Sequence, residues 1–185
     1  TVWFTDPSYG CLQFPQECYL PNNVYRFDPK NGDLSVVTGD LKMPNGIAFS
    51  LDEKILYLID SAAIQAPGTY YQSNPHAIYA FDVGGDGKTL SNKRTLAVIS
   101  PGFPDGMRLD KEGNIYVGAM DGVHVLNRQG KLIGKVLLPK QTANLTFGGK
   151  DNNVLFICSS DSIWAIKLNT QGAKPIPILG TSVQK

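Results

Sequence analysis

The stretch MPNGIAFSLDEKILYLID (residues 43–60) returns sixty residues later as FPDGMRLDKEGNIYVGA (residues 103–119). Both copies begin with Pro-Asx-Gly, continue with apolar residues at matching places, and reach an apolar segment after a charged turn. At the head of the second copy, Asp105 stands where the first copy has Asn45. Repetition at this spacing is typical of architectures that place equivalent supersecondary units side by side.

The same landmarks recur along the chain and predict units of four short strands. First strands are expected at 44–50, 104–110 and 143–149. Second strands, apolar on both faces, are expected at 2–6, 55–60, 114–119 and 154–159. Third strands are expected at 23–28, 77–82, 122–127 and 162–167. Fourth strands are expected at 34–38, 95–100 and 132–138, with KPIPIL (174–179) as a candidate for the last unit.

Four short strands in about 40–60 residues match one blade of a β-propeller. The sequence therefore predicts an all-β fold in which residues 1–185 supply about three and a half to four blades of a single domain. A propeller closes into a ring, because an open end exposes apolar faces and a sheet edge. We expect N-terminal blades, from a preceding segment or a separate chain, to complete the ring.

Composition argues against several classes of partner. The formal net charge is +1, and the Lys and Arg residues are scattered, so neither a nucleic-acid surface nor a basic membrane patch is expected. The longest apolar runs are of about five residues, as in ILYLI at 55–59, whereas a helix needs roughly 20 to cross a bilayer.

The three cysteines leave the compartment open. Cys11 and Cys18 lie in one loop-like segment, where a local disulfide and two free thiols are both compatible with the sequence. A bridge would favour an oxidising, extracellular compartment. Cys158 lies in an apolar strand and is expected to be a small buried hydrophobic residue.

Propeller geometry brings three polar residues to one mouth of the central channel. First strands line that channel, so Asn45, Asp105 and Asn144 are expected at the same end of neighbouring blades. The glycine after Asn45 or Asp105 would allow a tight turn and let the side-chain oxygen point inward. Such hard oxygen donors suit Ca²⁺. Asn-Gly and Asp-Gly are also ordinary turn dipeptides, and that interpretation remains open.

Two long segments, 7–22 and 61–76, connect second and third strands and are expected to rise around the same mouth. They carry aromatic residues, of which Tyr9 and Tyr71 are predicted to bind substrate, together with Asn144.

Four motifs in this order, FTDPSYG (4–10), residues 43–60, residues 103–119 and NLTFGG (144–149), resemble signatures of the gluconolactonase family. That family also includes regucalcin, or senescence marker protein, and is similar to diisopropyl fluorophosphatase. The resemblance is closest to the secreted or bacterial lactonohydrolase branch and covers roughly residues 2–168. It implies a six-bladed propeller with one catalytic divalent cation in the channel, usually Ca²⁺.

By this resemblance Asn45 and Asp105 match two metal ligands, and Asp105 matches the general base or nucleophile. A family Glu and a further Asn have no counterpart here, so these residues would supply only part of the metal site. The resemblance implies a Ca²⁺-dependent hydrolase that opens a sugar-type (aldono)lactone. The alternatives are a phosphotriesterase or fluorophosphatase on the same metal site, and a propeller that only binds a partner.

Overall fold

The computed structural model describes residues 1–14, 16–66 and 68–174. The first sheet contains β1 (Val2–Asp6), β2 (Asn23–Asp28) and β3 (Asp33–Thr38). The second contains β4 (Pro44–Phe49), β5 (Ile55–Asp60), β6 (Ala77–Val83) and β7 (Leu90–Val98). The third contains β8 (Met107–Leu109), β9 (Ile115–Ala119), β10 (Gly122–Leu126) and β11 (Leu132–Leu137). The fourth contains β12 (Thr142–Gly148), β13 (Val154–Ser159) and β14 (Ser162–Lys167).

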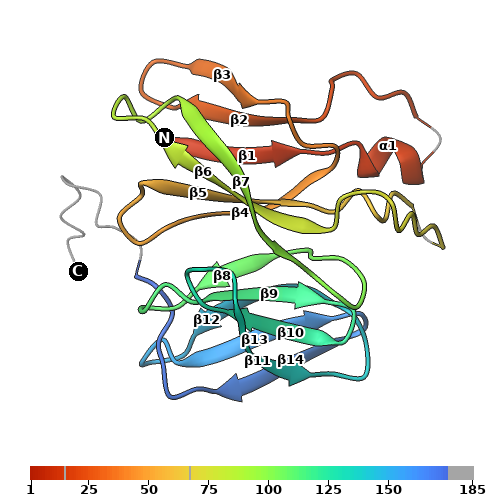
Figure 1. The fold of residues 1–185 in the computed structure, drawn as a ribbon, viewed down its shortest axis with the longest axis vertical. Coiled ribbons are helices and arrows are strands. Elements are labelled where there is room, and N and C mark those ends of the chain that lie inside the picture. Colours follow the sequence, from red (N-terminus) through yellow and green to blue (C-terminus); the bar gives the residue numbers. More distant parts are fainter. Residues whose placement is uncertain (15, 67, 175–185) are drawn as a thin grey trace.

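Each sheet is an antiparallel meander in which strands pair in chain order, and the sheets follow one another along the molecule (Figure 1). The first strands of successive sheets lie side by side, with β4 against β8 and β8 against β12. Strand β1 contacts β4 in the same way. Sheets arranged around a common row of innermost strands form a β-propeller, which confirms the predicted fold class. The number of blades in the complete ring stays a prediction.

Most strands lie within a few residues of their predicted positions, and the starts of β8 and β7 differ most. Strand β8 begins only at Met107. The preceding Asp105 and Gly106 still form backbone hydrogen bonds with Gly118 of β9, but the Gly106 N–H donates to the Ala143 carbonyl of the next sheet, 2.8 Å away. Strand β7 begins at Leu90, before the expected 95. The candidate strand at 174–179 lies outside the described residues except for Lys174.

The segment 7–22 contains a short helix, α1 (Tyr9–Gln13), which the sequence analysis did not predict. A single turn of five residues carries no apolar periodicity that could reveal it. Among the residues that the structure describes, no helix is long and apolar enough to cross a membrane.

The core consists of apolar layers between neighbouring sheets, and β5 contributes to two of them. Leu56 and Leu58 pack with Val24 of the first sheet, whereas Tyr57 and Ile59 pack in the cluster of the third sheet. Side chains alternate along a strand, so an uninterrupted apolar run is buried on both faces. This confirms the interpretation of residues 55–60 as a strand packed between blades.

The expectation that Cys158 is buried was wrong. In β13, Leu155 and Ile157 face the third sheet and are buried. Cys158 alternates with them and therefore points to the opposite face, where it is exposed. Within the described ranges, no sheet packs on that face.

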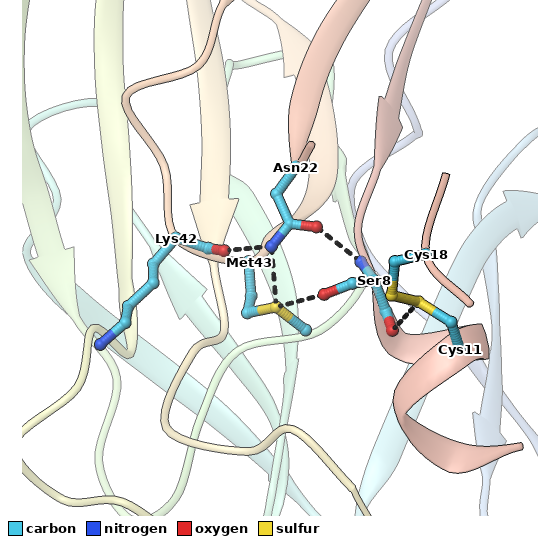
Figure 2. Close-up of a disulfide and its surroundings, with 6 residues drawn as sticks. All are labelled: Ser8, Cys11, Cys18, Asn22, Lys42 and Met43. Carbon is cyan, nitrogen blue, oxygen red and sulfur yellow. Dashed lines mark hydrogen bonds between the residues drawn. A yellow bond between two sulfur atoms is a disulfide. The ribbon is translucent and has the colours of Figure 1, made fainter. Parts of the chain in front are cut away.

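Cys11 and Cys18 form a disulfide, which decides between the two alternatives that the sequence left open (Figure 2). The bridge links α1 to the second half of the loop. The Asn22 side chain holds the loop's ends: it accepts a hydrogen bond from the Ser8 N–H at 2.7 Å and donates to the Lys42 carbonyl at 2.7 Å. The loop is thereby attached to the segment that precedes β4.

We expect Leu58→Ala to lower the free energy of unfolding by about 2–5 kcal/mol, because it removes a fully buried side chain between two sheets. Leu137→Ala is the matched control on β11, where the leucine is 70% exposed and the change should stay within about 0.5 kcal/mol. Denaturant unfolding of both variants measures the difference. Equal losses would contradict the assignment of β5 to the interior.

Peptide mapping without reductant should recover Cys11 and Cys18 as one linked pair. The residues are separated by seven positions, and closing such a loop should stabilise the protein by about 2–3 kcal/mol on the chain-entropy model. The double variant Cys11→Ser/Cys18→Ser should therefore unfold at lower denaturant concentration. Alkylation of both thiols in the unreduced native protein would rule out the bridge.

Candidate metal and substrate site

A β-bulge at the start of β4 places Asn45. The pairing between β4 and β5 shifts between Pro44, opposite Asp60, and Ile47, opposite Leu58, so β4 carries one extra residue. A bulge interrupts the ladder and re-aims the side chains within it. The Asn45 carbonyl accepts a hydrogen bond from the Thr5 hydroxyl at 2.8 Å, which ties the bulge to the first sheet.

The glycines after Asn45 and Asp105 have a different role from the one expected. Neither Gly46 nor Gly106 has a positive φ, so neither is needed for a left-handed turn. A Cβ added at Gly46 would lie 2.5 Å from the Asp105 carbonyl oxygen, and one at Gly106 would lie 2.3 Å from Asn144 Oδ1. Gly46 requires glycine because the backbone of Asp105 approaches too closely for a side chain, whereas at Gly106 the nearest obstacle is the Asn144 side chain.

A buried carboxylate holds the segment that leads into the bulge. Asp60, at the end of β5, accepts hydrogen bonds from the N–H groups of Lys42 (2.7 Å), Met43 (3.0 Å) and Ala62 (3.2 Å). Backbone donors of this kind satisfy a buried charge without a counter-ion. Asp60 is therefore a structural support for Asn45.

Asn45 and Asp105 meet across the gap between two sheets. The Asn45 Nδ2 donates to Asp105 Oδ1 at 2.9 Å and to Ser61 Oγ at 3.2 Å. Burial raises the pKa of Asp105 to about 6, against the smaller lowering effect of the hydrogen bond from Asn45. Among the described residues, no Lys, Arg or His forms an ion pair with Asp105. The carboxylate is thus desolvated and lacks a positive partner in this part of the chain.

Both residues line a cleft of about 310 Å³. Its other lining residues are Tyr9 and Gln13 of α1, Ile64, Gln65 and Ala66, and Phe103 and Gln141. The cleft lies where α1 and the segment between β5 and β6 project from the same end of the sheets (Figure 1). It adjoins a more apolar cleft of about 530 Å³, since Ile64, Phe103 and Gln141 line both.

Tyr9 is fixed by a hydrogen bond from its hydroxyl to the Ser61 carbonyl at 3.2 Å. Burial is the main cause that raises the pKa of Tyr9 well above its usual value, and the carboxylates of Asp105 and Asp60 add to it. The phenol therefore stays neutral and can act as a hydrogen-bond donor.

Three of the five predicted site residues, Asn45, Asp105 and Tyr9, line the same cleft. Asn144 packs against Gly106 but is exposed, does not line the cleft, and accepts a hydrogen bond from the Leu145 N–H at 2.9 Å. Tyr71 is 46% exposed and does not line it either.

Three residues at or beside the cleft, Gln13, Gln141 and Ser61, were not predicted from the sequence. Gln13 is brought in by α1, whose single turn has no sequence signal. Gln141 directly precedes β12, the innermost strand of the fourth sheet, and this place in the repeat could have identified it. Ser61 follows β5 directly and could have been found as the residue after the apolar strand of the first repeat copy.

Hard oxygen ligands are what Ca²⁺ and Mg²⁺ prefer. Asn45 and Asp105 supply amide and carboxylate oxygens, and a cation would compensate the desolvated charge of Asp105. Two side chains are fewer than the six to eight oxygens that Ca²⁺ takes, so they fit a cation as part of a larger set. No group of three or more His, Cys, Asp or Glu side chains that could hold a metal occurs among the described residues.

Comparisons with known proteins identify relatives of this chain. The chain is 34% identical over 162 residues to the lactonohydrolase OryH of Aspergillus oryzae, covering 81% of this chain and 34% of OryH. A gluconolactonase structure from Xanthomonas campestris superposes with a TM-score of 0.75 at 32% identity, covering 90% of this chain and 52% of that one. A calcium-binding regucalcin from Agrobacterium tumefaciens superposes with a TM-score of 0.65 at 18% identity, covering 84% of this chain and 54% of that one, which shows a shared fold.

The chain thus spans between about a third and a half of the length of these relatives. The model of the SMP-30/gluconolactonase/LRE-like region matches residues 1–161, which include every strand of the first three sheets and most of the fourth. The matched range contains both Pro-Asx-Gly segments and the cleft that Asn45 and Asp105 line. The chain belongs to the SMP-30/gluconolactonase/LRE-like family.

Proposed function

We propose that this protein is a lactonase that opens a sugar-type (aldono)lactone, with Asp105 as the catalytic residue. The observation that carries the proposal is the desolvated Asp105 carboxylate, hydrogen-bonded to Asn45 in a cleft of a gluconolactonase-family chain. A carboxylate with a pKa of about 6 is mostly ionised at neutral pH and is basic enough to accept a proton. The relatives named lactonohydrolase and gluconolactonase support the substrate class.

We further propose that Asn45 and Asp105 hold a divalent cation, either Ca²⁺ or another divalent cation that prefers oxygen ligands. Their oxygens suit a hard cation, and Asp105 has no positive partner among the described residues. When bound, such a cation would polarise the lactone carbonyl and stabilise the charge that develops on its oxygen. Further ligands would be water or residues outside the described ranges.

The side chains of the cleft supply the rest of the chemistry. Asp105 takes a proton from water as the water oxygen bonds to the lactone carbonyl carbon, and the ring C–O bond then breaks. The departing ring oxygen takes up the proton that Asp105 received, so that the carboxylate is restored and the product is a hydroxy acid. Alternatively, Asp105 attacks the carbonyl carbon itself and the ring oxygen leaves with a proton from water. A second water then hydrolyses the resulting mixed anhydride and restores the Asp105 carboxylate.

Binding and water exclusion fall to the other lining residues. Tyr9, Gln13 and Gln141 offer hydrogen bonds to the hydroxyl groups of the substrate, while Phe103 and Ile64 form an apolar wall. Asn144 and Tyr71 lie outside this cleft. Any contact that they make with the substrate would therefore involve the part of the substrate farthest from Asp105.

An assay panel separates this proposal from its alternatives. Aldonolactones and a phosphotriester would be tested with Ca²⁺ and with chelator, on the same preparation. Cation-dependent opening of an aldonolactone supports the lactonase. Turnover of the phosphotriester alone would assign the site to a phosphotriesterase or fluorophosphatase, and no turnover of either would leave a binding module.

Asp105→Asn should lower lactone turnover by at least about 10²-fold at saturating Ca²⁺, because it removes the basic carboxylate but keeps its size and one oxygen. Asn45→Ala is the comparison variant: it should weaken cation binding, and excess Ca²⁺ should restore part of its activity. Steady-state rates over a Ca²⁺ series measure both. Near wild-type turnover of Asp105→Asn would show that the second Pro-Asx-Gly is only architectural.

The stabilising effect of Ca²⁺ should grow as pH rises through about 6. The pKa of Asp105 is raised in the fold, so its contribution to stability is fully present below its unfolded pKa and is lost as pH passes the folded value of about 6. A cation that binds the ionised carboxylate reverses this loss. Melting temperatures with Ca²⁺ and with chelator, from pH 4.5 to 8, measure the difference. A Ca²⁺ effect independent of pH would contradict coordination by Asp105, and Asp105→Asn should abolish the pH dependence.

A further inference from the structure

The Ser61 side chain is part of a closed ring of hydrogen bonds that links the two candidate metal ligands, Asn45 and Asp105. Its side chain is fully buried directly after β5. The Ser61 hydroxyl donates to the carbonyl of Pro104, the residue that precedes Asp105, and accepts from Asn45 Nδ2 at 3.2 Å. Asn45 Nδ2 donates in turn to Asp105 Oδ1 at 2.9 Å, which closes the ring.

The directions of these hydrogen bonds follow from the groups themselves. A backbone carbonyl can only accept, so the single hydroxyl proton of Ser61 is used on Pro104. The Ser61 oxygen must then accept from Asn45. An ionised Asp105 carboxylate also can only accept. Because the Ser61 oxygen and the Asp105 carboxylate both need a donor, the amide nitrogen of Asn45, and not its oxygen, faces them.

Both protons of the Asn45 amide are thereby occupied, and the carbonyl Oδ1 of Asn45 remains for another partner. Without the Ser61 hydroxyl, Asp105 alone would orient the amide, and a rotation that exchanges oxygen and nitrogen would cost less. The hydrogen bond to Pro104 also fixes the backbone next to Asp105. One hydroxyl therefore constrains both residues, which come from different sheets.

We propose that Ser61 is a positioning residue that orients the Asn45 amide and leaves Asn45 Oδ1 directed to a hard cation. This inference rests on the proposed divalent-cation site. Residues that orient metal ligands typically affect metal affinity or activity by 10–100-fold when they are changed. Ser61 itself touches neither the cation nor the substrate.

Ser159 provides a matched control. It is also fully buried, and its hydroxyl donates to a backbone carbonyl, that of Lys140, at 2.9 Å. It lies at the end of β13, in the strand of the fourth sheet that corresponds to β5. No residue of the candidate site is hydrogen-bonded to its side chain in the described part of the chain.

The first measurement is calorimetric titration of the protein with Ca²⁺. Ser61→Ala should raise the Kd for Ca²⁺ by about 10–100-fold, whereas Ser159→Ala should leave it unchanged while lowering the melting temperature by a similar amount. Ser61→Cys nearly keeps the volume and should also weaken binding, since a thiol is a poor acceptor. A folded Ser61→Ala protein with the wild-type Kd would overturn the proposal.

A second measurement needs no metal. In the cation-free protein, the two Nδ2 protons of Asn45, assigned by their absence in Asn45→Asp, should give separate NMR signals that exchange slowly with water. Ser61→Ala should accelerate this exchange and Ser159→Ala should not; equal exchange in all three proteins would overturn the orienting role. Absence of Ca²⁺ binding by the wild type would instead overturn the proposed cation site and with it the metal-directed role of Ser61.

Discussion

The approach of the innermost strands to one another is the constraint on which the candidate site depends. At Gly46 the backbone of β4 lies so close to the Asp105 carbonyl that a Cβ would overlap it. Because no side chain separates these two backbones, Asn45 and Asp105 are brought together from different sheets. The 2.9 Å hydrogen bond from Asn45 to Asp105 is a consequence of that proximity.

The apolar layers between sheets maintain the close approach. Strand β5 contributes one face to the layer with the first sheet and the other to the layer with the third. Its last residue, Asp60, and the following Ser61 then hold the segments before Asn45 and Asp105 through hydrogen bonds. Strand β5, which packs in both apolar layers, is thus followed closely by the polar contacts of the site: its last residue Asp60 and the next residue Ser61 are both buried.

Two opposing effects set the pKa of Asp105. Burial disfavours the charged form, one amide hydrogen bond favours it, and no ion pair among the described residues compensates the remainder. A carboxylate in this state is both a good base near neutral pH and a group that gains from a cation. The chain belongs to a family whose members include proteins named lactonohydrolase and gluconolactonase. We therefore propose that the basicity of Asp105 and its affinity for a cation serve the hydrolysis of a lactone.

The sequence by itself determined the strands and their order, because the repeated segments and the period-2 alternation of apolar residues are local signals. It also singled out Asn45, Asp105 and Tyr9 as candidate site residues through their places in the repeat and the long loop, and the three line one cleft. The tertiary structure alone decided the rest. The bulge at Asn45, the helical turn that carries Gln13, the disulfide between Cys11 and Cys18, and the ring of hydrogen bonds through Ser61 have no local signature. The bulge and the hydrogen-bond ring depend on contacts between segments far apart in the chain, whereas the disulfide closes a short loop whose pairing the sequence left open. The exposure of Cys158 follows from which face of β13 a neighbouring sheet covers.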